Sequence, residues 1–173
     1  MPKQYRNTDR SHGFTLIELV MVIVILAVIA AFALPRFADL SSDARIAALE
    51  SVSGTMKSAI TIVRSKAYAQ GLSISASNPG GIQTQYVVET EAGRSEVDCR
   101  NLCPESRAEA ADTLTMLDYL SIDQSNTRFS TSVDNQYTRV GFNLPSEAGP
   151  DCYVEYDSFG NPECTVTKVL NGC

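Results

Sequence analysis

Closely spaced carboxylates are the side chains of this chain that could do acid–base chemistry. Glu89 and Glu91 form one such pair, and Glu96 and Asp98 form another. Acid–base catalysis needs carboxyl groups that the protein holds in defined and different environments. Both pairs lie in an acidic, polar stretch, where a solvated surface is the simpler explanation. We therefore interpret them as surface residues and expect no catalysis from them.

Five cysteines are the next candidates for covalent or metal chemistry, and they stand at Cys99, Cys103, Cys152, Cys164 and Cys173. Zinc is disfavoured, because the spacing contains no CxxC pair and His12 is the only histidine. The loop over residues 157–161 lacks the ligand series of a calcium loop, so we expect no metal and no cofactor. All five cysteines follow the apolar run described next, as in an exported head that forms disulfides. The odd number leaves at least one thiol unpaired or joined to another chain.

An uncharged apolar run extends from Leu19 to Leu34, and the acidic residue Glu18 directly precedes it. No second apolar run follows, which excludes a protein that crosses the membrane several times. Residues 1–13 are polar and mildly basic, so they are expected to stay in the cytoplasm. A carboxylate in hydrocarbon is costly unless it has a partner, and Glu18 is therefore a candidate functional residue.

Helical periodicity continues beyond the apolar run. Pro35 marks the exit and is expected to bend the helix or open it locally. The apolar residues that recur at intervals of three and four are Phe37, Leu40, Ala44, Ala48, Leu49, Val52, Met56, Ala59, Ile60, Val63 and Ala67. Gln70 and Gly71 provide a C-terminal stop. One helix from Phe14 to Gln70 would be roughly 85 Å long, so half is expected in a membrane and half on a head.

The rest of the chain predicts a small α+β head. Residues 85–90 are β-like, and a second helix is expected over residues 104–120, with Pro104 in its first turn. Strands are predicted at Thr127–Val133, Tyr137–Leu144, Cys152–Tyr156 and Cys164–Leu170. Turns at residues 134–136 and 158–162 join them as hairpins. The predicted fold is a long N-terminal helix packed on a four-stranded antiparallel sheet.

Charge is distributed unevenly along the chain. Residues 71–173 carry six basic and fifteen acidic side chains. Proteins that bind a phosphate backbone carry a basic stripe or patch. Nucleic acid is therefore not expected as a partner of this acidic head.

The junction GFTLIE at residues 13–18, at the foot of the apolar run, resembles the processing site of type IV prepilins. The resemblance continues through the apolar helix, Pro35 and the cysteine-bearing C-terminal end. The short leader resembles that of the type IVa subclass. The ending from Cys152 to Cys173 resembles the mannose-sensitive haemagglutinin branch of major pilins.

The resemblance implies a processing and assembly chemistry. A membrane prepilin peptidase would cut between Gly13 and Phe14 and methylate the new Phe14 amine. Glu18 would then meet the Phe14 amine of an identical neighbouring subunit, which supplies the cation that a buried carboxylate needs. Pro35 would allow local melting of the helix during assembly. His12 would leave with the leader, so no Ser–His or Cys–His dyad would remain, and an enzyme is not expected.

The resemblance also implies an organisation of the chain. Residues 1–13 would be a cleaved leader and residues 14–34 a transmembrane and polymerisation helix. Residues 35–70 would form an amphipathic helix packed on the head, and residues 71–173 the head itself. The subunit would cross the inner membrane once, meet the pilus assembly machinery there, and end in an extracellular fibre.

One C-terminal disulfide is usual in the family, and the resemblance assigns it to Cys152 and Cys173. The other cysteines depart from that pattern, so their pairing stays open. Cys99 and Cys103 could bond to each other and leave Cys164 free, or one of them could bond to Cys164.

Three functional interpretations follow. The first is a structural subunit of an attachment fibre, and the second is a pseudopilin of a type II secretion system, which shares the N-terminus. The third is a periplasmic binding protein released by ordinary signal peptidase at the A-x-A site formed by Ala31 and Ala33. Cleavage there would discard Glu18 and leave the amphipathic helix without a purpose. The pilus subunit is therefore the favoured interpretation.

Overall fold

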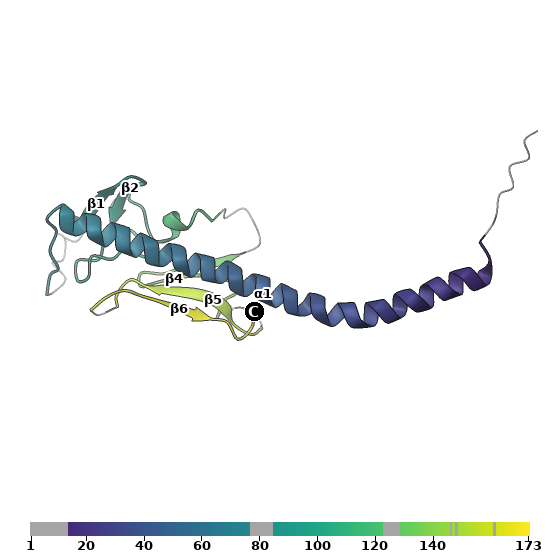
Figure 1. The fold of residues 1–173 in the computed structure, drawn as a ribbon. Helices are drawn as coiled ribbons and strands as arrows, with labels where there is room; N and C mark the ends of the chain where they lie inside the picture. Colours follow the sequence, from purple (N-terminus) through teal and green to yellow (C-terminus); the bar gives the residue numbers. More distant parts are fainter. Residues whose placement is uncertain (1–13, 77–84, 123–128, 146, 148, 161) are drawn as a thin grey trace, which may run out of the picture. The chain divides into compact units, whose positions relative to one another are not determined.

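The computed structural model describes residues 14–76, 85–122, 129–145, 147, 149–160 and 162–173, without the side chains of residues 38 and 39 (Figure 1). The chain divides into two compact units, Met1–Ser41 and Ser42–Cys173. A single long helix contributes its first half to one unit and its second half to the other.

That helix, α1, extends over Leu16–Ala69 and confirms the predicted helix to within two residues at each end. Its C-terminus is closed by Gly71, whose backbone has a φ of 82°. The Gly71 N–H donates to the Tyr68 carbonyl, and the Leu72 N–H donates to the Ala67 carbonyl. These two bonds form a Schellman motif, which favours glycine because its φ is positive. Gly71 therefore ends α1 as the sequence predicts.

In the first unit no residue of the apolar run is buried. The most apolar 18-residue stretch of α1 contains no buried residue. Exposure continues past Pro35, since Phe37 and Leu40 are 67% and 62% exposed. The apolar face of α1 is therefore covered by the head only in the second unit, from Leu49 onward.

The second unit contains the predicted antiparallel sheet. Its strands are β3 (Ser130–Val133), β4 (Tyr137–Asn143), β5 (Cys152–Asp157) and β6 (Thr165–Val169), in the order β3-β4-β5-β6. Neighbours in sequence are neighbours in the sheet, as in a meander of hairpins. All four predicted strands are thereby confirmed to within one residue at each described end.

The main core lies between α1 and this sheet, which Figure 1 shows side by side. The helix contributes one apolar face, at helical spacing, and the sheet contributes alternate residues of its central strands. The fully enclosed members are Leu49, Met56, Val140, Val154 and Tyr156, together with Met116 from the intervening segment. The amphipathic pattern of the sequence therefore identifies the packed face of the helix from Leu49 onward, while its earlier members Phe37 and Leu40 are exposed.

A second, smaller core lies at the C-terminal end of α1. It joins Val63 and Ala67 of the helix to Val88, Val97 and Leu102. Val88 belongs to a two-stranded hairpin of β1 (Val87–Thr90) and β2 (Gly93–Glu96), which Figure 1 shows beside the end of α1. Strand β1 confirms the predicted β-like segment, while β2 was not predicted.

The second helix expected over residues 104–120 is wrong. Only Leu117–Leu120 is helical, as a short 3-10 turn, η2. Val97 forms a bridge with Pro104, and Ser95 forms one with Leu114. The chain before η2 therefore satisfies its backbone by lying along β2, and tertiary pairing overrides the helical pattern.

Candidate assembly site

The start of α1 is organised by Thr15 and Glu18. The Thr15 N–H and hydroxyl donate to Glu18 Oε2 over 2.9 and 2.8 Å, and the Glu18 N–H donates to Thr15 Oγ1 over 3.3 Å. This reciprocal arrangement is a capping box, in which a Thr and a Glu three residues later satisfy the first free N–H groups of a helix. It places the Glu18 carboxylate one turn from Phe14.

The capping box uses only one oxygen of the Glu18 carboxylate. Both bonds from Thr15 go to Oε2. Within the part of the chain that the structure describes, Oε1 has no hydrogen bond from another residue. A carboxylate can accept about four hydrogen bonds, so Glu18 has room for a further donor. Phe14, next to it, is 86% exposed.

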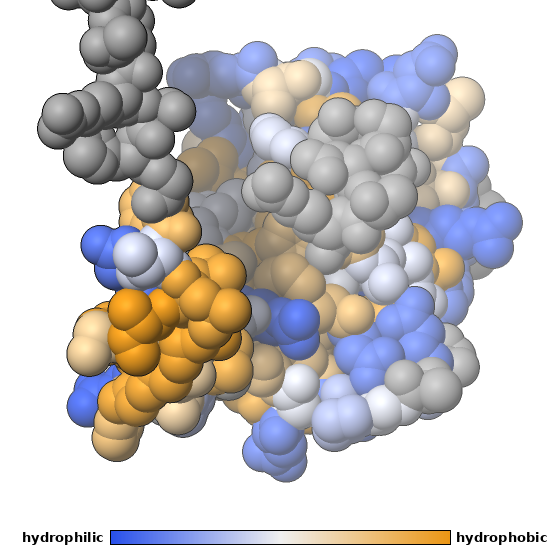
Figure 2. Space-filling model, turned by 90° about the vertical axis from the view of Figure 1, so that its right-hand side faces the viewer, coloured by the Kyte–Doolittle hydropathy of each residue, from blue (hydrophilic) through white to orange (hydrophobic). Residues whose placement is uncertain are grey.

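The surface around this site is apolar. Over residues 14–34 the large apolar side chains are between 39% and 86% exposed. Figure 2, viewed toward this end of α1, shows them as the main orange cluster on the displayed face. Among the described residues, α1 is the one helix long and apolar enough to cross a membrane. Contiguous apolar surface of this extent marks a membrane or protein interaction site.

Two other predicted site residues have different outcomes. Pro35 lies inside α1, which is helical on both sides of it, so the local opening that the sequence suggests is not seen. Gly13, the residue before the predicted cut, lies outside the described residues, as does His12. Neither the cut nor its chemistry is tested by the fold.

The cysteines of the head form two disulfides. Cys152 bonds to Cys173, and Cys103 bonds to Cys164. Of the two alternatives left open by the sequence, the structure has the one that ties the 99–103 loop to the sheet. Cys99 is a free thiol and is buried. Burial raises the pKa of the Cys99 thiol, which makes it a poor nucleophile at neutral pH.

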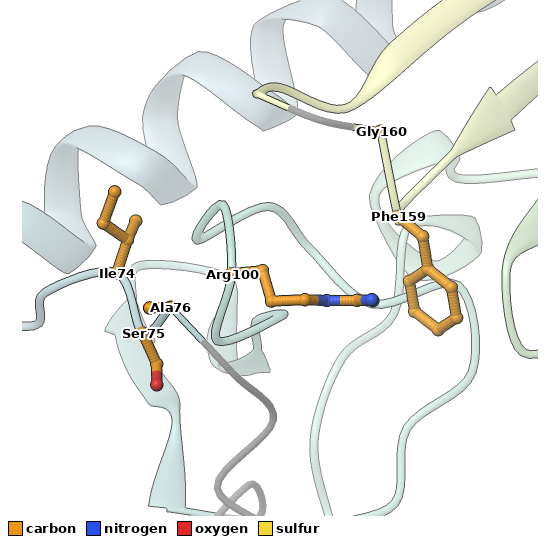
Figure 3. Close-up of a pocket in the computed structure, with 6 residues that line it drawn as sticks. All are labelled: Ile74, Ser75, Ala76, Arg100, Phe159 and Gly160. Carbon is orange, nitrogen blue, oxygen red and sulfur yellow. The ribbon is translucent and has the colours of Figure 1, made fainter.

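A pocket beside the 99–103 loop has a charged side chain in it (Figure 3). Its lining residues are Ile74, Ser75, Ala76, Arg100, Phe159 and Gly160. Arg100 points toward Phe159, with its guanidinium carbon 4.4 Å from the ring centroid. Asp98 holds the same guanidinium, with 2.7 Å between Arg100 Nη2 and Asp98 Oδ2. The arginine is therefore already paired within the protein.

The carboxylate pairs differ from their sequence interpretation in one case. Glu89 and Glu91 are exposed, as expected, but Glu96 and Asp98 are buried, so a solvated surface is the wrong interpretation for them. Glu105, which stands at the start of the helix expected over residues 104–120, is also buried. The N–H groups that compensate Glu96 come from Glu109 and Ala110, so the local sequence pattern carries no signal of its burial. No group of three or more potential ligands among the described residues could hold a metal ion.

Comparison with known proteins identifies the N-terminal motif and a relative. A family model described as the prokaryotic N-terminal methylation motif matches residues 8–34. Over 109 residues the chain is 32% identical to the "Type IV narrow pilus major component PilA5" of Thermus thermophilus. That match covers 62% of this chain and 87% of the relative. No solved structure matches the chain significantly.

Proposed function

The chain belongs to the type IV pilin family, and we propose that it is a structural subunit of a type IV pilus that polymerises through α1. Membership supports the coarser statement that it is a subunit of a pilus or of a pseudopilus. The choice of a surface fibre, its role in attachment and the processing step belong to the proposal. So does the finer likeness to the mannose-sensitive haemagglutinin branch, which the comparisons do not distinguish.

One observation carries the proposal. The apolar half of α1 is 0% buried in the isolated chain, and an acid stands at its start with one oxygen open. Such a helix is stable in a bilayer or inside a bundle of like helices, and it is unstable in water. Packing against copies of itself would bury the apolar side chains outside the membrane. Assembly then transfers the helix from lipid to a fibre core.

Glu18 gives this packing a register. Cleavage between Gly13 and Phe14 creates an amine at Phe14, and methylation leaves its positive charge in place. The amine of one subunit is the cation that the Glu18 carboxylate of its neighbour lacks. A buried carboxylate without a partner is strongly disfavoured. Subunits that join out of register would therefore lose the ion pair and would also leave the Glu18 carboxylate buried and unpaired.

Residues 1–13 determine orientation before assembly. They are polar and mildly basic, and basic residues stay on the cytoplasmic side. The subunit would thus cross the inner membrane once, with its head outside. There it would meet prepilin peptidase and the assembly machinery and leave as part of the fibre.

A surface fibre is favoured over a secretion pseudopilus by the covalently closed head. Two disulfides tie the C-terminus and the 99–103 loop to the sheet, which suits a head exposed to shear and proteases. The relative named as a major pilus component points the same way.

Processing is tested by intact mass and N-terminal sequencing of exported protein. The proposal expects a chain that begins with methylated Phe14. A chain that begins at Leu34, after the A-x-A site, would remove the pilin function altogether.

Assembly is tested by electron microscopy of sheared surface fractions with an antibody against the head. Fibres labelled by the antibody are expected from wild-type cells and should be lost in Glu18→Ala cells, while processed subunit remains in the membrane. Glu50→Ala is the matched control, because it removes an exposed acid from the same helix. If wild-type cells carry no fibres that the antibody labels, and deletion of the chain abolishes protein secretion, the pseudopilus function replaces the proposal.

A further inference from the structure

Three acids are buried together in the head. Glu96, Asp98 and Glu105 are 0%, 1% and 2% exposed. Glu96 is the last residue of β2, and Asp98 directly precedes the 99–103 loop. Glu105 follows Pro104 in the segment that lies along β2. Buried acids are rare unless each has a compensating partner, so their partners determine which of them can be charged.

Two of the three acids have such partners. Asp98 accepts hydrogen bonds from the Arg100 backbone N–H, Nε and Nη2, and both of its oxygens are used. Glu96 Oε2 accepts the N–H groups of Glu109 and Ala110 over 2.6 and 2.8 Å. These contacts stabilise two negative charges within one small region.

Glu105 has no comparable partner among the residues that the structure describes. Its Oε1 is buried without a hydrogen bond, as is Oε1 of Glu96. Its backbone is held on both sides, since its N–H donates to the Glu96 carbonyl and its carbonyl accepts from the Met116 N–H. A third negative charge here would face two existing ones without a cation of its own. Such a group takes up a proton instead.

We propose that Glu105 is a proton-operated latch of the head: its carboxyl is protonated while the 104–116 segment is packed on β2, and loss of the proton loosens that segment. The latch is independent of the proposed pilus function, because it concerns contacts within one head.

The surroundings of Glu105 support this assignment from every side. Glu96 faces it from β2, Asp98 and Arg100 from the loop, and Glu109 from its own segment. Of these only Arg100 is cationic, and Asp98 occupies it. Burial, followed by the charges of Asp98 and Glu96, raises the pKa of Glu105 to about 8.

The charged groups named above as acting on Glu105 do not come from strand β5 or helix α1. Tyr156 of β5 donates its hydroxyl to the Pro104 carbonyl, and burial raises its pKa well above the ordinary value, so it stays neutral. Arg64 of α1 pairs with Glu163.

The segment that the latch holds covers the core. Besides the Glu105 bonds, the Leu114 N–H donates to the Arg94 carbonyl, and Glu109 and Ala110 bind Glu96. Met116, at its end, is fully buried in the main core. Loosening the segment would therefore expose backbone of β2 and apolar core together.

The sign of the pH dependence follows from the raised pKa. In the unfolded chain a glutamate ionises near its ordinary pKa, whereas in the folded head Glu105 has a pKa of about 8 and keeps its proton below that pH. Between these values the unfolded state binds fewer protons, so the head loses stability as the pH rises. The folded-to-unfolded ratio should fall by up to about tenfold per pH unit from this one group.

The test uses full-length processed protein in detergent micelles, with urea unfolding followed by tyrosine near-ultraviolet circular dichroism between pH 5 and 9. Glu105→Gln resembles the protonated side chain and should remove up to about tenfold per pH unit from the slope. In this variant the amides of residues 105–116 should also exchange slowly at pH 9. In the wild type, exchange of the same amides should rise between pH 5 and 9 by more than the intrinsic pH dependence of amide exchange. Glu91→Gln, the same change at an exposed acid, should keep the wild-type slope. An unchanged slope in Glu105→Gln would overturn the proposal.

A second measurement covers the case in which Glu105→Gln does not fold. The carboxyl carbon of Glu105 can be titrated by nuclear magnetic resonance in wild-type protein with labelled glutamate. A midpoint near 8 supports the latch, and a midpoint near the ordinary glutamate value refutes it.

Discussion

The Tyr156 hydroxyl donates a hydrogen bond of 2.6 Å to the carbonyl oxygen of Pro104, which lies 52 residues earlier in the chain. Both groups are buried. The bond joins the middle of the sheet to the start of the 104–116 segment, so the position of that segment depends on a residue of β5.

Tyr156→Phe should test how much this bond contributes. The ring would keep its packing in the main core, while the Pro104 carbonyl would lose its donor in a place that water does not reach. We expect a loss of about 1–3 kcal/mol in unfolding free energy, measured by urea unfolding at constant pH. Tyr68→Phe removes a hydroxyl from an exposed tyrosine and should leave stability unchanged. Equal stability of both variants would show that the Pro104 carbonyl finds another partner.

The two glycines near α1 should respond in opposite ways to alanine. Gly54 lies inside the helix with no atom within 4 Å of an added Cβ, so Gly54→Ala should stabilise the head by about 0.5–1 kcal/mol. Gly71 has a φ of 82°, which strains any side chain, so Gly71→Ala should destabilise it by about 1 kcal/mol. Thermal unfolding of the two variants side by side measures both. A shift in the same direction for both would contradict the assigned helix end.

The two disulfides should differ in what their loss does. Cys103–Cys164 and Cys152–Cys173 span 61 and 21 residues, and the chain-entropy model gives about 4 and about 3 kcal/mol for loops of these sizes. Replacing both cysteines of a bridge by serine should therefore lower the unfolding free energy more for Cys103–Cys164 than for Cys152–Cys173. The control is Cys99→Ala, which breaks no bond. A Cys99→Ala variant as unstable as either double variant would mean that Cys99 takes part in a bridge.

Thr15 should matter for the start of the helix. Thr15→Ala removes the hydroxyl that binds Glu18 and the side-chain cap of the Glu18 N–H, so the first turn should fray. Hydrogen exchange of the amides of residues 16–18 in micelles should be faster in this variant. Thr15→Ser keeps the hydroxyl and should exchange as the wild type does. Slow exchange in Thr15→Ala would show that the capping box is dispensable for the helix.

The sequence by itself determined the elements whose signals are local. Helix α1 follows from an apolar run and then a stripe at helical spacing, and it ends at Gly71 because only a glycine readily adopts the positive φ of the stop. The four strands of the sheet follow from short β-branched and aromatic runs with turn residues between them. The GFTLIE junction, also local, indicates the family, and it lies within the N-terminal methylation motif that matches residues 8–34.

Only the tertiary structure decided features that depend on segments far apart in the chain. Nothing near Cys103 indicates that its partner is Cys164, because that pairing depends on how the loop lies on the sheet. The helix expected over residues 104–120 failed since β2, itself unpredicted, offers its backbone to the same residues. Glu96 looks like a surface acid in sequence, and Glu105 stands at the start of the helix that was expected over residues 104–120. In the folded head Glu96 is compensated by N–H groups of Glu109 and Ala110, which lie 13 and 14 residues later. Glu105 is buried with one oxygen unbonded among the described residues. Burial of this kind depends on contacts between segments, so the local sequence does not predict it.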